Sequence, residues 1–110
     1  MELTRGDTGR YKFQRSDAEG NPILSVPSEM YFTVKRSYES DTVILQKKLE
    51  DMTMDETGFW HFTIEPADTQ AKEIGDYVFD IEVTTTEGIV QTIAKGSLRL
   101  TAEATWYTDK

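Results

Sequence analysis

The sequence predicts an all-β fold, an antiparallel β-sandwich of about seven short strands. Apolar and polar residues alternate with a period of two through most of the apolar segments, which is typical of half-buried strands. These segments recur at intervals of about 8–15 residues and are separated by Gly, Pro, Asn and Asp, the usual turn residues. Helical periodicity is almost absent. A chain of 110 residues is enough for one domain with a single core.

The segment 75–83 has the clearest alternation, and we expect it to be the central strand of the core. One predicted face is apolar, and it consists of Tyr77, Phe79, Ile81 and Val83. The other is mixed, and it carries Asp76, Val78, Asp80 and Glu82. Gly75 precedes the strand, where a turn can lead the chain into it. We expect Tyr77 to hold the corner at this entry.

The N-terminal part begins with a short strand at Leu3 and Thr4, followed by turn residues 5–9. The tripeptide Arg5-Gly6-Asp7 is a known cell-adhesion recognition sequence, but Gly-Asp is also ordinary turn chemistry, and the turn is the favoured interpretation. A half-buried strand is expected at residues 10–15, with Tyr11 and Phe13 facing inward. Residues 17–22, which contain Gly20, form the strongest turn signal in the chain.

Ile23 and Leu24 resume the apolar pattern before Pro27, which cannot donate a hydrogen bond within a central strand. A third strand is expected at residues 30–36, and its inward residues are Met30, Phe32 and Val34. Residues 37–41 form a polar loop. The register of residues 42–49 is ambiguous. This strand is either partly covered on both faces or lies at a sheet edge, where Lys47 and Lys48 would protect it from pairing.

An acidic connection at residues 50–58 leads to a strand at 59–64 whose inward residues are Trp60, Phe62 and Ile64. Pro66 ends this strand, and residues 67–74 are expected to form a helical turn with Asp68 or Thr69 as its N-cap. After the central strand, residues 84–88 form a hairpin loop. The last strand spans 89–101, and a β-bulge is expected at Gly96. We assign residues 1–104 to the sandwich and residues 105–110 to a C-terminal tail.

Composition excludes several classes of function. Without Cys the chain has neither a disulfide nor a thiolate metal site. Its net charge of −8 disfavours binding to nucleic acid or to an anionic membrane, and favours solubility or a basic partner. No apolar run is as long as a spanning helix, and the polar N-terminus does not resemble a signal peptide. We therefore expect a soluble protein that is not secreted by a standard signal.

The residues capable of chemistry indicate no catalytic, cofactor-binding or metal-binding site. His61 is the sole histidine and is expected on the solvent face of its strand, opposite Trp60. The acidic residues 51, 55 and 56 fit a solvated loop better than a calcium loop, because the alternating ligands and central Gly of such a loop are missing. The chain has no Gly-x-Ser-x-Gly motif and no Gly-rich phosphate loop.

Two sets of residues are candidates for contacts at the surface. The acidic residues Asp76, Asp80 and Glu82 are expected to form cross-strand pairs with Lys35 or Arg99, and a glycosidase carboxylate pair is discounted because no cleft accompanies them. Trp106 and Tyr107 follow the last strand. They either fold back onto the domain or anchor a partner, since Trp and Tyr dominate interface hot spots.

Several segments together resemble immunoglobulin-like domains encoded in bacteriophage structural modules, and specifically the N-terminal domain of phage baseplate upper proteins. They are Arg5-Gly6-Asp7-Thr8, the strand with Tyr11 and Phe13, the turn 17–23, and the segments 31–35, 57–64, 75–83 and 92–96. The similarity covers nearly the whole chain. It implies that Tyr77 forms a tyrosine corner and that Phe79 stands where antibody domains place a cysteine. Baseplate upper proteins are longer, so their attachment role does not carry over.

The resemblance implies an immunoglobulin-like β-sandwich that serves as a structural component of a virion or prophage, such as a tail, baseplate or neck protein. Such a protein is not an enzyme and needs no cofactor. Its partners would be other phage structural proteins or further copies of the chain, and it would reach the virion by assembly in the host cytoplasm. The alternative is a bacterial immunoglobulin-like adhesion or carbohydrate-binding module, which would use exposed aromatics such as Tyr31, Tyr38 or Trp106.

Overall fold

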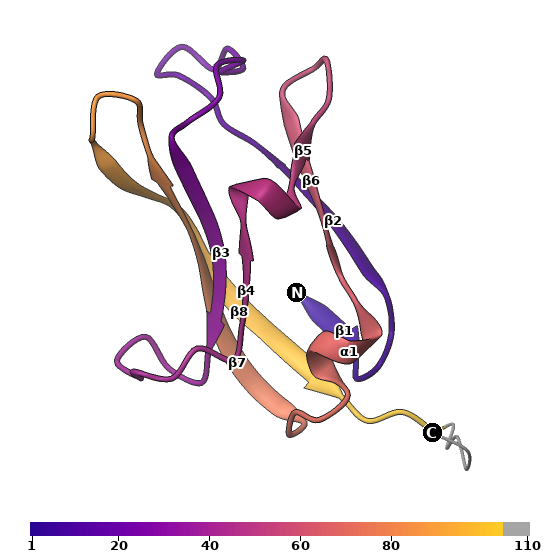
Figure 1. The fold of residues 1–110 in the computed structure, drawn as a ribbon. Coiled ribbons are helices and arrows are strands. Elements are labelled where there is room, and N and C mark those ends of the chain that lie inside the picture. Colours follow the sequence, from indigo (N-terminus) through magenta and orange to yellow (C-terminus); the bar gives the residue numbers. More distant parts are fainter. Residues whose placement is uncertain (105–110) are drawn as a thin grey trace.

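Eight strands form two facing sheets in the computed structural model, which describes residues 1–104 (Figure 1). The larger sheet has the order β1-β8-β7-β3-β4 and the smaller sheet the order β2-β6-β5. The strands are β1 (Glu2–Thr4), β2 (Gly9–Gln14), β3 (Glu29–Lys35), β4 (Leu45–Lys48), β5 (Thr53–Met54), β6 (Phe59–Ile64), β7 (Gly75–Thr84) and β8 (Val90–Thr101). The order of β8, β7 and β3 against β2, β6 and β5 is that of an immunoglobulin-like sandwich, so the predicted fold class is confirmed.

Two features of the topology differ from the expected antiparallel sandwich of about seven strands. The first strand, β1, pairs in parallel with the last strand, β8, whereas the other pairings are antiparallel. The eighth strand is β5, a two-residue strand inside the acidic connection, which also contains the 3₁₀ turn η1 (Leu49–Asp51). Met52 lies between them and is buried, so this connection packs one apolar side chain into the core.

The core lies between the sheets, and the period-two pattern predicted most of its side chains, but not Met52, while Phe79, predicted to face inward, is only half-buried. Its largest members come from β3, β6, β7 and β8, and they are Met30, Phe32, Val34, Trp60, Phe62, Ile64, Tyr77, Ile81, Val83, Leu98 and Leu100. The rings of Phe32 and Phe62, which belong to different sheets, have centroids 4.6 Å apart. Strand β7 is third of five in its sheet, as expected for the central strand.

The corner before β7 is held by Tyr77. Its hydroxyl donates a hydrogen bond to the carbonyl oxygen of Glu73, four residues upstream, which is the geometry of a tyrosine corner. Gly75 lies between them with a φ of 138°, a value that favours glycine. The guanidinium of Arg36 stacks 4.6 Å from the centroid of the Tyr77 ring. The predicted role of Tyr77 as a structural pin is confirmed.

The bulge in the last strand lies at Ile93, so its prediction at Gly96 is wrong. Ile81 is opposite Ala94, but the next residue, Glu82, is opposite Thr92, which leaves Ile93 as the extra residue. Gly96 has a different role, because a Cβ placed there would lie 2.8 Å from two atoms of the Phe79 ring. The glycine makes room for that ring, a requirement that the pattern of β8 alone does not reveal.

The helical turn also begins earlier than predicted. Helix α1 spans Pro66–Thr69 with Glu65 as its N-cap residue, so neither Asp68 nor Thr69 is the N-cap. Proline is favourable at the first helical position because its missing N–H would have no partner there. The Asp68 carboxylate accepts a hydrogen bond from the backbone N–H of Glu65 at 2.7 Å. Thr69 is buried, and its hydroxyl accepts a hydrogen bond from the backbone N–H of Gly6 at 2.8 Å.

Of the two interpretations of residues 42–49, the edge strand is correct. Strand β4 begins at Leu45 and lies at one end of the larger sheet, while Val43 is 45% exposed. Lys47 extends from this edge and forms an ion pair with Asp68 of α1 at 2.7 Å. Residues 23–26 form no strand, and Leu24 is 54% exposed although it continues the apolar pattern.

Candidate interaction surfaces

The outer face of the larger sheet is a broad polar surface built by strands β3, β4, β7 and β8. Because their apolar residues point into the core, the alternate residues point outward. With β1 included, this outer face carries four basic and five acidic side chains, namely Lys35, Lys48, Lys95, Arg99, Glu2, Glu29, Asp76, Asp80 and Glu82. Acidic and basic side chains therefore nearly balance on this face, although the whole chain has a net charge of −8.

The predicted cross-strand charge pairs are partly present on this outer face. Arg99 and Asp76 lie opposite each other in β8 and β7, and the Nε of Arg99 is 3.0 Å from the Asp76 carboxylate. This hydrogen bond raises the pKa of Arg99. Lys35 is opposite Val78, so its register does not pair it with an acidic residue. Asp80 lies opposite Thr33 of β3 and Lys95 of β8.

Tyr38 reaches onto the same face from the loop between β3 and β4. Its hydroxyl lies 3.2 Å from the carbonyl oxygen of Phe79 and 3.1 Å from that of Gly96 and can donate to either, while the residue remains 43% exposed. The ammonium of Lys95 lies 5.0 Å from the centroid of its ring. The polar composition of residues 37–41 predicted the loop, but no periodicity could place its tyrosine over two neighbouring strands.

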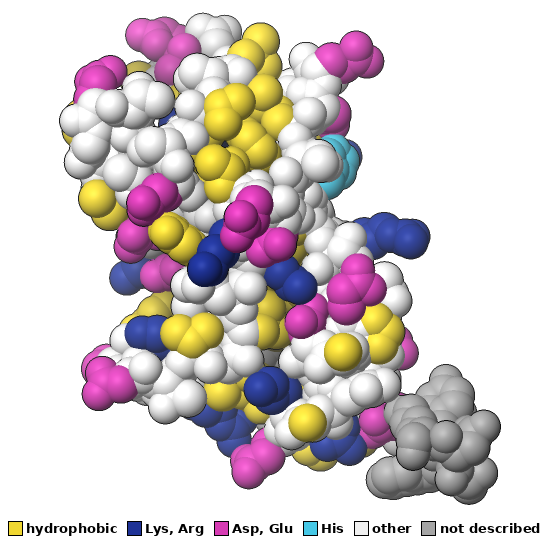
Figure 2. Space-filling view, viewed as in Figure 1, with side chains coloured by type: hydrophobic (Ala, Val, Ile, Leu, Met, Phe, Trp, Pro, Cys, Tyr) yellow, Lys and Arg dark blue, Asp and Glu magenta, His cyan; other side chains and the backbone are white. Residues whose placement is uncertain are grey.

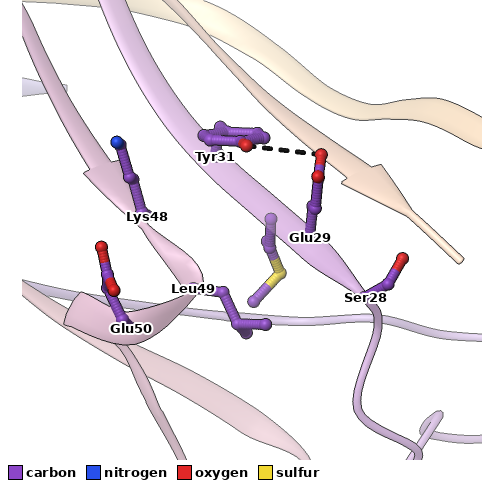
Figure 3. A pocket seen from close by; sticks show the side chains of 7 residues that line it. Ser28, Glu29, Tyr31, Lys48, Leu49 and Glu50 are labelled. Carbon is purple, nitrogen blue, oxygen red and sulfur yellow. Dashed lines mark hydrogen bonds between the residues drawn. The ribbon is translucent and has the colours of Figure 1, made fainter. Parts of the chain in front are cut away.

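A shallow depression of about 300 Å³ lies at the end of this face, where β3 begins and β4 passes into η1 (Figure 3). Figure 3 shows the ring of Tyr31 between Lys48 and Glu29, with Leu49 and Glu50 on the other side of the depression. The Tyr31 hydroxyl donates to the Glu29 carboxylate at 3.3 Å. Nearby negative charges raise the pKa of Tyr31, and the charge of Glu29 has the largest effect.

One end of the sandwich exposes apolar side chains. Figure 2 shows hydrophobic atoms gathered where the loop between β2 and β3 approaches the turn between β5 and β6. Leu24 and Pro22 pack over Gly58 in that turn. Arg15 is buried beneath the loop and donates to the carbonyl oxygen of Ser25 at 3.2 Å, and burial lowers the pKa of its guanidinium.

His61 lies on the outer face of the smaller sheet, as predicted, and contacts the acidic turn before β6. Its Nε2 is 2.8 Å from the carboxylate of Asp55. The other oxygen of Asp55 accepts hydrogen bonds from the backbone N–H groups of Thr57 and Phe59 and from the Thr57 hydroxyl. These hydrogen bonds hold the pKa of Asp55 far below its usual range, and the bond with His61 has the largest effect. The acidic residue thus organises a turn.

The Arg5-Gly6-Asp7 tripeptide lies in a turn, where the N–H of Asp7 donates to the carbonyl oxygen of Thr4. The guanidinium of Arg5 binds the Glu103 carboxylate at 2.9 Å and the carbonyl oxygen of Lys72 at 3.1 Å. The hydrogen bond with Glu103 raises the pKa of Arg5. The arginine therefore ties the N-terminal turn to the chain after β8 and to the segment that follows α1.

The predicted partner residues Trp106 and Tyr107 lie outside the described residues. Within residues 1–104, no three His, Asp or Glu side chains gather in a way that would hold a metal ion. The helices of the same part of the chain include none with the length and hydrophobicity needed to span a membrane.

Comparison with known proteins assigns the chain to no family. No family model and no curated protein matches the chain. Among solved structures, the chain is similar to CopC from Methylosinus trichosporium OB3b, with 12% sequence identity and a TM-score of 0.43. The alignment covers 74% of this chain and 71% of that chain.

Proposed function

We propose that the chain is a non-enzymatic structural protein of a phage or prophage particle, a component of the tail, baseplate or neck, that acts through protein–protein contacts. The observation that carries the proposal is the outer face of the larger sheet, with two tyrosines, Tyr31 and Tyr38, among mixed charges. Tyrosine is enriched where protein interfaces carry their binding energy, and a polar surround is typical of their rims.

The charge of this outer face supports contact with neighbouring proteins of an assembly. Like charges on two surfaces repel each other when they are brought together, and the chain as a whole is strongly acidic. A face on which acidic and basic side chains nearly balance reduces that cost and also offers both signs for specific pairing. The resemblance to the N-terminal domain of phage baseplate upper proteins supplies the virion as the place of assembly, with other phage structural proteins or further copies as partners.

A matched pair of substitutions tests the proposal. Thr33 points outward from β3 in the larger sheet, and Thr63 points outward from β6 in the smaller sheet. Arginine at position 33 would place a long charged side chain across the proposed interface, whereas Thr63→Arg makes the same change on the opposite side of the molecule. We expect particles assembled with Thr33→Arg to lack the protein and particles with Thr63→Arg to contain it.

Both variants are first checked for an unchanged circular dichroism spectrum and a similar melting temperature, so that a loss of incorporation reports on the interface. Equal incorporation of the two variants would refute the proposed face. Absence of the unsubstituted protein from purified particles, or a gene located among metabolic genes, would refute the virion role itself. Deletion of the residues after Ala104 then tests Trp106 and Tyr107. We expect this deletion to weaken association without lowering the melting temperature.

A bacterial adhesion or carbohydrate-binding module is the second candidate. The depression beside Tyr31 favours it, because an aromatic ring flanked by the polar groups of Glu29, Lys48 and Glu50 can stack on a sugar and bind its hydroxyls. Binding on a glycan array that is lost in Tyr31→Ala and kept in Tyr11→Ala would favour this function over the virion role.

A further inference from the structure

Strand β2 provides a long open edge on the smaller sheet. The four terminal strands of the two sheets are β1, β4, β5 and β2, with three, four, two and six residues respectively. In an immunoglobulin constant-type domain the first strand lies beside the second and closes this edge. Here β1 pairs with β8 in the other sheet, and within residues 1–104 β2 pairs only with β6. Figure 1 shows β2 at the outer margin of the smaller sheet.

The two faces of this edge differ in chemistry. Arg10 and Lys12 are exposed on the outer face. Tyr11 and Phe13 are half-buried on the inner face, where both rings pack against Phe62 at centroid distances of 5.7 and 6.2 Å. A strand added beside β2 would cover the open sides of both aromatic rings and place its outward residues next to two positive charges.

A second copy of the chain is a poor occupant of this edge. In an antiparallel pair, the residues that lie opposite each other are on the same face of the sheet. Two copies of β2 paired along most of their length would therefore place Arg10 or Lys12 opposite Arg10 or Lys12 of the other copy. Like charges opposite each other destabilise a strand pair, and basic side chains are a common protection of exposed edges. The same side chains attract a strand of opposite charge.

We propose that the β2 edge binds an extended acidic segment of another protein by strand addition. Acidic residues at alternate positions would lie beside Arg10 and Lys12, and apolar residues between them would cover Tyr11 and Phe13. The net charge of −8 opposes an acidic partner at long range, but that repulsion is screened beyond about 8 Å at physiological ionic strength, so the local basic pair dominates. This site is separate from the outer face of the larger sheet and does not depend on the virion role.

The test uses the whole chain and a synthetic peptide in which glutamate alternates with valine over the six residues that β2 spans. Backbone amide shifts and hydrogen exchange are followed by NMR during titration. We expect amides of residues 9–14 to shift and to become protected, while those of β4, the basic edge of the other sheet, stay unchanged. The matched peptide, with lysine in place of glutamate, should bind at least about tenfold more weakly.

Reversal of charge on the protein distinguishes strand addition at β2 from general attraction. Both basic residues are exposed, and the Lys12 ammonium lies 4.7 Å from the centroid of the Phe59 ring, so Arg10→Glu combined with Lys12→Glu should lower the melting temperature only slightly. This variant should prefer the lysine peptide over the glutamate peptide. The control is Lys48→Glu in β4, because Lys48 is exposed and has no ion-pair partner within residues 1–104, and this change should not alter the preference. The proposal is overturned if β2 amides do not respond, or if reversal at β2 and at β4 have equal effects.

Discussion

The hydroxyl of Tyr77 and the carbonyl oxygen of Glu73 form a hydrogen bond that closes the corner between the two sheets. The chain leaves the smaller sheet at Ile64, passes through α1 and enters the larger sheet at Gly75. Tyr77 is buried, so without this bond its hydroxyl would lose contact with water and gain no partner. The carboxylate of Glu73 also lies 3.4 Å from Arg36, whose guanidinium covers the Tyr77 ring.

Replacement of Tyr77 by phenylalanine should lower the free energy of unfolding by about 1–2 kcal/mol, because it leaves the Glu73 carbonyl oxygen without this donor while the ring remains in place. Urea unfolding followed by tryptophan fluorescence measures the change. The control is Tyr11→Phe, since within residues 1–104 the hydroxyl of Tyr11 has no hydrogen-bond partner. Similar losses in both variants would show that the corner bond contributes nothing specific.

Gly96 should tolerate no larger side chain, although glycine in a strand normally weakens it. On strand propensity alone, Gly96→Ala would stabilise the protein. A Cβ at this position would instead lie 2.8 Å from the Phe79 ring, which packs on Phe32 with a centroid distance of 5.4 Å. We therefore expect a loss of about 1–3 kcal/mol in the free energy of unfolding from overpacking.

A smaller side chain at position 79 provides the control for this clash. In a Phe79→Leu background the ring is gone, so the further change Gly96→Ala should cost much less than in the unsubstituted protein. A double-mutant cycle from chemical denaturation gives this difference directly. If alanine at position 96 stabilises the protein in both backgrounds, the close approach to the Phe79 ring does not control this position.

Local pattern was sufficient for the corner and for most of the core, but not for Met52, which lies in a segment expected to be an acidic connection. The alternation in β3, β6 and β7 identified the buried residues, because a half-buried strand must keep its apolar side chains on one face. The bulge and the helix cap depended on more than local pattern. Gly96 looked like the irregular residue of β8, but which residue is extra depends on pairing with β7, and that pairing leaves out Ile93. Leu24 follows the apolar period and is exposed, because the residues before Pro27 join no sheet.

The candidate surfaces were predictable to a smaller extent. The outward position of Tyr31 follows from the inward positions of Met30 and Phe32, and the pair of Arg99 with Asp76 was among those expected. The place of Tyr38 depends on the path of a loop, and the open edge of β2 depends on which sheet receives β1. Both are decided by contacts between residues far apart in the sequence, which a period of two does not encode.

The turn before β6 should lose stability in acid because of Asp55. The pKa of Asp55 is lowered in the folded protein, and the hydrogen bond with His61 is the largest cause. In the unfolded chain this pKa should be about 3.9. A carboxyl group whose pKa is lowered by folding stabilises the protein fully at pH values above its pKa in the unfolded chain. This contribution is lost as the pH falls through its pKa in the folded protein. The difference in stability between the unsubstituted protein and Asp55→Asn should therefore be larger at a pH of about 5 than in strong acid.

Two measurements separate the charge of Asp55 from its role in the turn. In Asp55→Asn an amide oxygen can still accept from the N–H groups of Thr57 and Phe59, so Asp55→Ala should be less stable than Asp55→Asn. In His61→Gln the NMR titration midpoint of the Asp55 carboxyl carbon should move upward. An unchanged midpoint would mean that His61 does not lower this pKa.

The ion pair of Lys47 and Asp68 should couple the edge of the larger sheet to the corner helix. The Lys47 ammonium lies 2.7 Å from the Asp68 carboxylate, and both side chains are largely covered, with 15% and 26% of their surfaces exposed. Covered charges are screened less by water than exposed ones, so a coupling energy of about 1 kcal/mol is expected, at the upper end for pairs near a surface. Lys47→Met keeps the apolar stem of the lysine, and Asp68→Asn keeps an oxygen that can accept from the N–H of Glu65.

A double-mutant cycle of Lys47→Met and Asp68→Asn, measured by urea unfolding, isolates this coupling from the packing of the stem and from the helix cap. The same cycle on Arg99→Met and Asp76→Asn is the matched control, because that pair is 3.0 Å apart but 62% and 71% exposed. We expect the exposed pair to give a smaller coupling energy, and high salt to reduce it more strongly. Equal coupling energies in the two cycles would show that the partial burial of Lys47 and Asp68 does not strengthen their ion pair.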